Sequence, residues 1–200
     1  MTLLDLTTYA GTFVFAITGA FKARASKMDI FGASVLAFAT AYGGGTLRDL
    51  LIGIRPVNWI NDNIALLIVV ISIIVAALFK LSSSQFRKVL FFTDAMGLGL
   101  FTIAGIEKSL QLGINNIYSV IMGVITATFG GLLADILCNA VPNLLKRGEL
   151  YATACAIGGI VYIFLKRTTF NYETNIVGCV IIIIAIRIYS KRKRLSLPEI

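Results

Sequence analysis

The sequence matches itself without gaps when it is shifted by 86 positions (130 − 44 = 86). Chance would align scattered Leu and Ile residues in so apolar a chain, but it would not align glycine pairs, an aspartate, a lysine and a proline at one offset. The aligned pairs include Gly44-Gly45 with Gly130-Gly131, Asp49 with Asp135, Lys22 with Lys108, and Pro56 with Pro142. The chain is therefore predicted to hold two copies of one structural unit.

Seven runs of apolar residues, bounded by charged ones, account for most of the chain. Of its 200 residues 58% are hydrophobic and 14% are charged, a balance outside the usual range of soluble domains. The runs are continuous instead of alternating, and an open sheet edge cannot persist in hydrocarbon, so helices are favoured over strands. We predict an all-α membrane protein with seven transmembrane helices, at residues 6–21, 30–47, 64–79, 89–106, 114–134, 150–165 and 174–186.

Each copy of the repeat holds three of these runs, which is an odd number. The second copy must then cross the bilayer in the opposite sense to the first, which makes the repeat inverted. The predicted organisation is a first three-helix unit at residues 1–86 and an inverted second unit at 87–170. Residues 171–200 add a seventh helix, interrupted by Arg187, and a basic cytoplasmic tail that would bind anionic membrane lipids.

Positive charge is distributed unequally between the two sides of the predicted bundle. The chain has 18 Lys and Arg residues, of which 13 lie at the ends of or after runs one, three, five and seven, and five lie on the other side (13 + 5 = 18). Cytoplasmic loops of multi-pass membrane proteins carry the excess of Lys and Arg. The N-terminus is therefore predicted to lie outside the cell membrane and the C-terminus in the cytoplasm.

Composition also argues against several classes of function. The net charge of +8 does not indicate nucleic-acid binding, because the basic residues lie at the ends of apolar runs and form no stripe with interleaved aromatics. Histidine is absent, which removes Ser-His-Asp hydrolysis and nearly every zinc arrangement. We predict that the protein is not an enzyme and that it uses no cofactor and no metal.

Adjacent glycines stand near the C-terminal ends of runs two and five, and each group is followed by an aspartate. Each glycine weakens a helix by about 1 kcal/mol relative to alanine, so both helices are predicted to be broken or kinked there. In an inverted repeat the two weak points approach from opposite faces, as expected around a central permeation or binding site. The alternative is close packing of helices through small residues.

The candidate pore and gating residues combine these glycines with the polar residues that follow them. They are Gly43, Gly44, Gly45, Thr46, Arg48, Asp49, Gly130, Gly131 and Asp135. A charge at these positions needs a partner, water or the interface. The charged members therefore either attract and gate ions, or Arg48 pairs with Asp49 or Asp135 and only fastens helices.

Three further charged residues are candidates for gating or lipid contact. Asp94 lies within the fourth run, or near the interface beside Lys88. Lys22 and Lys108 are equivalent in the repeat and would contact lipid phosphates or gate the pathway. The alternative for both lysines is ordinary snorkelling to the interface.

Several segments, spread over nearly the whole chain, form a specific set. They are 13–20 (FVFAITGA), 43–51 (GGGTLRDLL) with Pro56-Val57, 94–98 (DAMGL), 101–105 (FTIAG), 130–135 (GGLLAD) and 149–152 (ELYA). As a set they resemble the prokaryotic branch of the trimeric intracellular cation channel family, whose bacterial relatives are also catalogued as a putative glycine transporter domain. The sequence departs from that pattern at Ala134, where the family has an Arg before the aspartate, and at Phe129, where it frequently has Gly.

This resemblance implies a homotrimer in which each protomer has its own pore, lined mainly by kinked second and fifth helices and conducting K⁺ and, to a lesser degree, Na⁺. The leading hypothesis is thus a passive monovalent cation channel. The alternative is a secondary transporter of a small zwitterion such as glycine, because an inverted repeat also serves alternating access. The chain has no carbonyl filter of the Thr-Val-Gly-Tyr-Gly type, so we expect modest cation selectivity.

Overall fold

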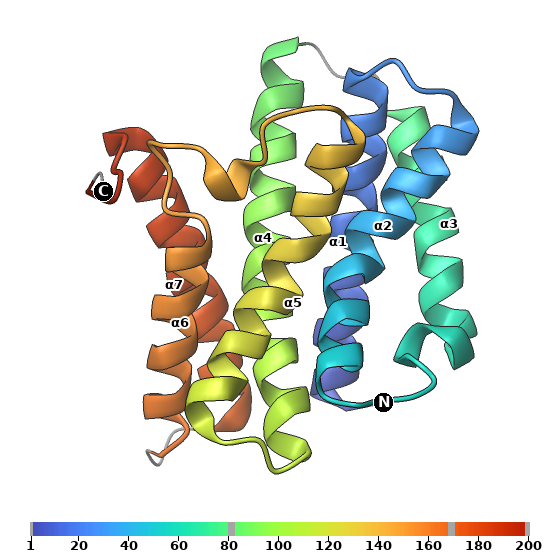
Figure 1. Ribbon diagram of the computed structural model, residues 1–200. Coiled ribbons are helices and arrows are strands. Elements are labelled where there is room, and N and C mark those ends of the chain that lie inside the picture. Colours follow the sequence, from blue (N-terminus) through green and yellow to red (C-terminus); the bar gives the residue numbers. More distant parts are fainter. Residues whose placement is uncertain (1, 80–82, 168–170, 199–200) are drawn as a thin grey trace.

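The computed structural model describes residues 2–79, 83–167 and 171–198, where the regular structure is entirely helical (Figure 1). Two short 3₁₀-helices, η1 (Asn58–Asn61) and η2 (Asn143–Leu145), follow α2 and α5. Within the described ranges there are seven α-helices, which confirms the predicted fold class: α1 (Leu3–Ala25), α2 (Ile30–Leu51), α3 (Asn63–Leu78), α4 (Ser83–Gln111), α5 (Asn116–Leu137), α6 (Ala152–Leu165) and α7 (Tyr172–Lys193).

Polar residues between the apolar runs start several of the helices by capping them. Thr2 and Asp5 form a capping box at the start of α1. The side chains of Asp29, Asp62 and Asn115 accept backbone N–H bonds in the first turns of α2, α3 and α5. The same polar residues that separate the runs in the sequence therefore set where these helices begin.

Several helices are longer than the apolar runs that predicted them, and α4 and α7 show this clearly. α4 begins before Lys88 and continues past Lys108, and α7 continues through Arg187 to a last turn rich in Lys and Arg. The sequence rule treated each charge as a boundary, whereas these side chains find polar partners or reach the ends of the bundle from within a helix. Arg187 therefore lies inside a continuous seventh helix and does not interrupt it.

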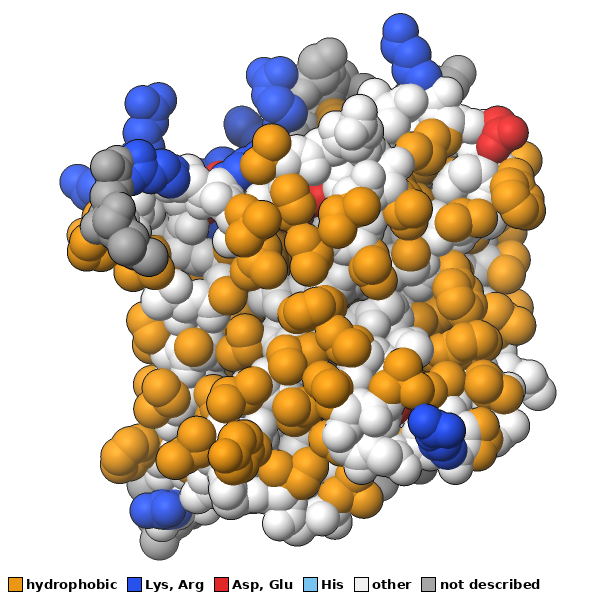
Figure 2. Space-filling view, viewed as in Figure 1, with side chains coloured by type: hydrophobic (Ala, Val, Ile, Leu, Met, Phe, Trp, Pro, Cys, Tyr) orange, Lys and Arg blue, Asp and Glu red, His pale blue; other side chains and the backbone are white. Residues whose placement is uncertain are grey.

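The helices form a multi-pass membrane protein. By length and composition α1, α2, α4, α5 and α7 can each span a bilayer, whereas α3 and α6 have 16 and 14 residues. At about 1.5 Å per residue the two short helices fall below the hydrocarbon thickness of about 30 Å, so neither is long enough to cross it alone. Figure 2 shows apolar side chains covering the middle of one face, with Lys and Arg at its two ends.

Corresponding helices of the two predicted units make corresponding contacts. α1 contacts α2 and α4, and α5 contacts the same two helices, so these four form the centre of the protein. α3 packs against α1 and α2 just as α6 packs against α4 and α5, whereas α7 packs against α4 and α6, beside the second unit (Figure 1). The unit boundaries stay predictions, and both the boundary at residue 170 and the basic residue Lys80 lie outside the described residues.

The contacts at the centre are reciprocal between the two units. A Cβ atom placed on Gly44 would lie 2.0 Å from the carbonyl oxygen of Thr126, and one placed on Gly130 would lie 2.1 Å from that of Thr40. A shift of 86 positions converts each contact into the other (44 + 86 = 130; 40 + 86 = 126). The backbones of α2 and α5 thus approach so closely that only glycine fits at these two positions.

Candidate functional site

The glycines of α2 and α5 join helices and do not interrupt them. Both helices are continuous through these residues, so the predicted break is wrong, whereas the kink that was the other expectation stays a prediction. The physical reason is the close crossing at Gly44 and Gly130, which buries backbone against backbone. That contact offsets the weak intrinsic helix preference of glycine. The packing interpretation, which the sequence left as the alternative, describes these two residues.

The other three predicted glycines have different surroundings. An added Cβ would lie 2.5 Å from Leu133 Cδ1 at Gly43 and 2.7 Å from the Tyr151 hydroxyl at Gly131, so both positions are close-packed. At Gly45 the nearest atom is a guanidinium nitrogen 3.9 Å away, and this residue borders a cavity. Of the five predicted glycines, Gly45 is therefore the one that the structure places beside open space.

Two adjacent cavities open at the end of the bundle where α1 begins, which we call the N-terminal end. Their volumes are about 250 and 80 Å³, and the smaller lies deeper between the helices. Both are lined by Thr8, Arg48, Asn58, Asp62 and Ala104. The smaller one also reaches the predicted residues Gly45, Thr46 and Asp49, and the larger one reaches Lys108. Several sequence-predicted candidates from both units therefore gather at this end.

Arg48 and Asp49 form an ion pair between neighbours in α2. Nε and Nη2 of Arg48 donate to Oδ1 of Asp49 at 3.0 and 2.7 Å. Oδ2 of Asp49 accepts the backbone N–H of Asn58 at 3.0 Å, which ties the loop after α2 to the helix end. Of the two partners that the sequence offered for Arg48, the structure selects Asp49. The charges of the pair thus neutralise each other at the wall of the cavities.

The opposite end of the bundle, where α7 ends, holds a different pair, and we call it the C-terminal end. Nζ of Lys22 lies 2.7 Å from Oδ1 of Asp135 and 3.4 Å from the carbonyl oxygen of Gly131. Oδ2 of Asp135 accepts the backbone N–H of Asn143 at 2.8 Å. Lys22 is only 7% exposed, so the snorkelling interpretation is wrong for this residue. Its ammonium group is held inside the protein by a carboxylate from the other unit.

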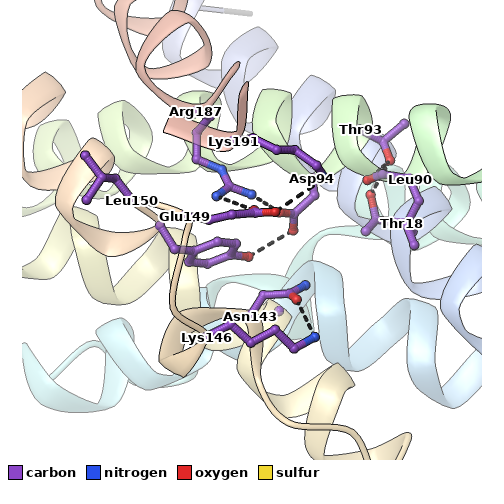
Figure 3. A network of polar contacts seen from close by, with 12 residues as sticks. Thr18, Leu90, Thr93, Asp94, Asn143, Lys146, Glu149, Leu150, Arg187 and Lys191 are labelled. Atoms are coloured by element: carbon purple, nitrogen blue, oxygen red, sulfur yellow. Dashed lines mark hydrogen bonds and ion pairs between the residues drawn. The ribbon is translucent and has the colours of Figure 1, made fainter. Parts of the chain in front are cut away.

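Asp94 belongs to a buried polar network beside this pair (Figure 3). It accepts a hydrogen bond from the Tyr151 hydroxyl at 2.9 Å, and Arg187 Nη2 approaches it at 3.3 Å. Arg187 Nη1 also pairs with Glu149 at 3.0 Å, and Lys191 lies 3.4 Å from the same carboxylate. Asp94 is 4% exposed and lies within α4, where α7 supplies a buried cation that the three-helix repeat does not contain.

This network lines a further cavity of about 210 Å³ at the C-terminal end. Its wall includes Lys22, Asp94, Glu149, Arg187 and Lys191. Sequence reasoning selected the first two but missed Glu149 and Arg187 as site residues. A charge inside an apolar run was the available signal for Arg187, since intramembrane charges pair with one another. Polar cavities thus exist at both ends of the bundle.

Two phenylalanines fill the centre between these ends. The rings of Phe15 and Phe101 meet edge to face with centroids 5.1 Å apart, and both side chains are buried. Phe15 lies against Gly97 and Phe101 lies against Gly11, so the contact is again reciprocal between the units. Phe101 also lines the smaller cavity at the N-terminal end.

A second buried carboxylate, which the sequence did not single out, lies near the C-terminus of α4, at the N-terminal end of the bundle. Glu107 is 4% exposed and accepts hydrogen bonds from the hydroxyls of Tyr162 and Tyr172, and it also pairs with Lys166. These partners come from α6, its C-terminal flank and α7. The cluster fastens the outer helices to α4, so we assign it to packing and not to the cavities.

The comparisons with known proteins agree with this architecture. A family model described as "Glycine transporter" matches residues 5–80 and 91–167, and the two matched segments begin 86 residues apart (91 − 5 = 86). A UPF0126 membrane protein of Vibrio cholerae is 39% identical over 197 residues, which cover 98% of this chain and 82% of the relative.

Two solved structures match over almost the whole chain. The TRIC trimeric intracellular cation channel orthologue from Rhodobacter sphaeroides superimposes with a TM-score of 0.86 at 33% identity, covering 98% of this chain and 100% of that one. A prokaryotic TRIC channel crystallised in 0.5 M KCl gives a TM-score of 0.87 at 30% identity, covering 98% of each chain. With the family model matching most of its length, the chain belongs to the TRIC/UPF0126 family of multi-pass membrane proteins.

Proposed function

We propose that this protein is a passive channel for monovalent cations, permeable to K⁺ and to a lesser degree Na⁺, with one pathway in each protomer. The observation that carries the proposal is the similarity, at 30–34% identity over nearly the full chain, to solved structures titled as TRIC cation channels. The polar cavities at the two ends of the bundle support it, because a pore must be accessible to water from both sides.

The pathway in this proposal runs between α1, α2, α4 and α5. Gly45, Thr46, Arg48 and Asp49 form its wall at the N-terminal end, with Lys108 at the mouth. At the C-terminal end Lys22 and Asp94 line the wall, and Asp135 holds Lys22. α2 and α5 slide past each other at their crossing, because small residues there let the two helices approach closely. These residues are the close-packed Gly43, Gly44, Gly130 and Gly131. Opening separates Phe15 from Phe101.

Purified protein reconstituted in a planar bilayer tests this function. We expect discrete unitary currents whose reversal potential follows the K⁺ gradient and shifts less steeply with a Na⁺ gradient. Ions pass a pore down their gradient without one conformational cycle for each ion, whereas a carrier needs such a cycle. Vesicles that accumulate glycine saturably, carry no unitary currents and leak no K⁺ would instead establish the alternative.

That alternative, secondary transport of a small zwitterion, is favoured by one specific observation. The matching family model is described as a glycine transporter. The protein also holds cations and carboxylates side by side at both ends, such as Arg48 with Asp49, and zwitterions require both charges. Uptake of labelled glycine into the same vesicles, with and without ion gradients, separates the two functions directly.

Orientation and assembly complete the proposal. We place the N-terminal end outside the cell membrane and the C-terminal end, with the basic tail, in the cytoplasm, because of the 13 to five distribution of Lys and Arg (13 + 5 = 18). A homotrimer is supported by the description of the Rhodobacter sphaeroides relative as trimeric. A single cysteine introduced after Arg194, in a variant lacking the native cysteines, should resist impermeant thiol reagents in intact cells. Labelling of this cysteine from outside would show that the protein has the opposite orientation.

A further inference from the structure

One buried hydroxyl at the N-terminal end has no hydrogen-bond partner. The Tyr42 side chain comes from α2, is 7% exposed and lines the smaller cavity. Its Oη atom is wholly buried and meets no donor or acceptor of the described residues. A buried hydroxyl without a partner is unfavourable by about 1–3 kcal/mol, so buried polar groups are nearly always satisfied. The geometry therefore calls for a ligand or ordered water at this hydroxyl.

Aromatic rings form one wall of the same cavity. The ring of Trp59 lies 5.7 Å from that of Tyr42 at an interplanar angle of 32°, and Phe38 packs edge-on against both. The Trp59 indole N–H donates to Thr46 Oγ1 at 3.0 Å, which fixes the ring at the cavity wall. Faces of Trp and Tyr attract cations through their quadrupoles.

Three of the hydroxyl groups of the wall present lone pairs and not protons. Thr8, Thr12 and Thr126 each donate their hydroxyl hydrogen to a carbonyl one turn earlier in their own helix, at 2.6–3.0 Å. The hydroxyl of Thr46 accepts from Trp59. With their hydrogens so used, the oxygens of the first three have only acceptor capacity left for the cavity. These three oxygens therefore favour a cation over an anion.

The charges of the wall lead to the same conclusion. Arg48 is the cation of the smaller cavity, and two of its three guanidinium nitrogens are taken by Asp49. The carboxylate of Asp62 is then the uncompensated charge of the wall. Asp62 also borders the larger cavity, so it lies where a cation would pass from the mouth to the deeper space. Opposite charge in a low-dielectric cleft concentrates the counter-ion.

We propose that the smaller cavity is a binding site for a small monovalent cation, either K⁺ or the ammonium group of a small amino compound, held by Tyr42, Trp59 and Asp62. The inference deepens the proposed function and rests on it for the route by which the cation arrives. The volume of about 80 Å³ admits an ion with several waters, since one water needs about 10–15 Å³. The ligand completes the hydrogen bonding of Tyr42 Oη, which donates to water or accepts from an ammonium group.

The chain contains one tryptophan, Trp59, so its fluorescence reports on this cavity alone. Tl⁺ resembles K⁺ in size and quenches tryptophan on contact. The purified full-length protein in detergent is titrated with thallous nitrate at constant ionic strength, set with N-methylglucamine nitrate. We expect quenching that saturates, and K⁺ or glycine, added separately, should reverse it competitively. Trp59→Phe removes the signal and verifies its source.

Two variants separate binding from simple collision. Tyr42→Phe keeps the ring and removes a hydroxyl with no protein partner, and Asp62→Asn removes the charge while keeping the helix cap. Each should weaken Tl⁺ binding by about fivefold or more. Asp29→Asn makes the same change at the cap of α2 at the other end of the bundle and should leave binding unchanged.

The outcomes separate this inference from the proposed function. Reversal by K⁺ supports the site with K⁺ as occupant, and reversal by glycine alone supports it with an ammonium occupant. Quenching that rises linearly with Tl⁺ and is equal in Tyr42→Phe and Asp62→Asn overturns the site, even if unitary currents are present. Saturable quenching in a protein without unitary currents supports the binding site and contradicts the proposed channel function.

Discussion

The two ends of the central four-helix group have related backbones but different ion pairs. At the N-terminal end Arg48 and Asp49 are neighbours in α2, and their pair leaves the other helices untouched. At the C-terminal end Lys22 of α1 reaches Asp135 of α5, so the pair connects the two units. Asp49 and Asp135 are equivalent under the 86-residue shift (49 + 86 = 135). Duplication thus preserved the acids, while their partners differ.

A single position explains most of this difference. Ala134 stands at the place that corresponds to Arg48 (48 + 86 = 134), so Asp135 has no neighbouring guanidinium. Lys22 fills that role from another helix, whereas its counterpart Lys108 lies at the mouth of the larger cavity. The C-terminal end is further reinforced by Arg187 of α7. At the C-terminal end ion pairs therefore join α1 to α5 and α4 to α7, whereas at the N-terminal end the Arg48–Asp49 pair lies within α2.

Removal of the lysine at the C-terminal end should have the largest effect. Lys22→Met leaves Asp135 with the Asn143 N–H, and Asp135 is not among the residues that line the 210 Å³ cavity. Breaking a buried ion pair from one side destabilises a protein by about 3–5 kcal/mol, because a charge stays buried without compensation. Thermal unfolding in detergent should show this loss.

The double variant Lys22→Met with Asp135→Leu serves as the control for that loss. Replacing both partners removes the uncompensated charge, so most of the lost stability should return. If Lys22→Met alone unfolds at the wild-type temperature, the lysine does not connect the units and the comparison between the two ends fails.

Substitution of either glycine at the central crossing of α2 and α5 should reduce stability by the same amount. Gly44→Ala and Gly130→Ala each push a methyl group against a carbonyl oxygen of the other unit, at 2.0 and 2.1 Å. Overpacking of this kind destabilises by about 1–3 kcal/mol. Gly45→Ala is the matched control, since its nearest neighbour is 3.9 Å away, and it should gain up to about 1 kcal/mol from helix propensity. Unequal losses at Gly44 and Gly130 would show that the asymmetry of the ends extends to the centre.

The sequence predicted those features that repeat or that depend on hydropathy. The 86-residue match predicted which residues are equivalent, and the apolar runs predicted seven helices, because both signals are local and strong. Asp49 and Asp135 do hold the loops after their helices in the same way, through the N–H groups of Asn58 and Asn143. The two aspartates therefore have equivalent backbone contacts, whereas their role in a pathway stays a prediction.

The ion-pair partners of Lys22 and Arg187 could not be predicted, because these pairs depend on contacts between helices. A lysine at the end of an apolar run looks the same whether it snorkels or pairs, and Lys22 pairs only because α5 brings Asp135 within 2.7 Å. Arg187 lies outside the repeat, so nothing in the internal comparison indicated that it would pair with Asp94. The glycines do not break their helices for a similar reason, since backbone contact across the crossing offsets their weak helix preference, and the predicted kink stays a prediction.

The arginine at the N-terminal end should have the smallest effect. Arg48→Met leaves Asp49 at the wall of an 80 Å³ cavity that water can enter, and the Asn58 N–H remains in place. Lys108 shares the neighbouring cavity with Arg48, and its counterpart Lys22 shows that a lysine at this position of the repeat can reach the equivalent carboxylate. We expect Lys108 to pair with Asp49 in place of Arg48, so that the single variant loses less than about 1 kcal/mol of stability.

The takeover by Lys108 has a distinctive signature in a double-mutant cycle. Lys108→Met alone should be nearly neutral, whereas Arg48→Met combined with Lys108→Met should lose more than the sum of the two, by about 0.5–3 kcal/mol. Coupling of this sign means that either cation can pair with Asp49. The N-terminal end then tolerates the loss of one cation, whereas the C-terminal end does not. Strict additivity would instead mean that Lys108 cannot reach Asp49. The two units would then differ in the positions of their helices as well as in the residue before the aspartate, which is Arg48 in the first unit and Ala134 in the second.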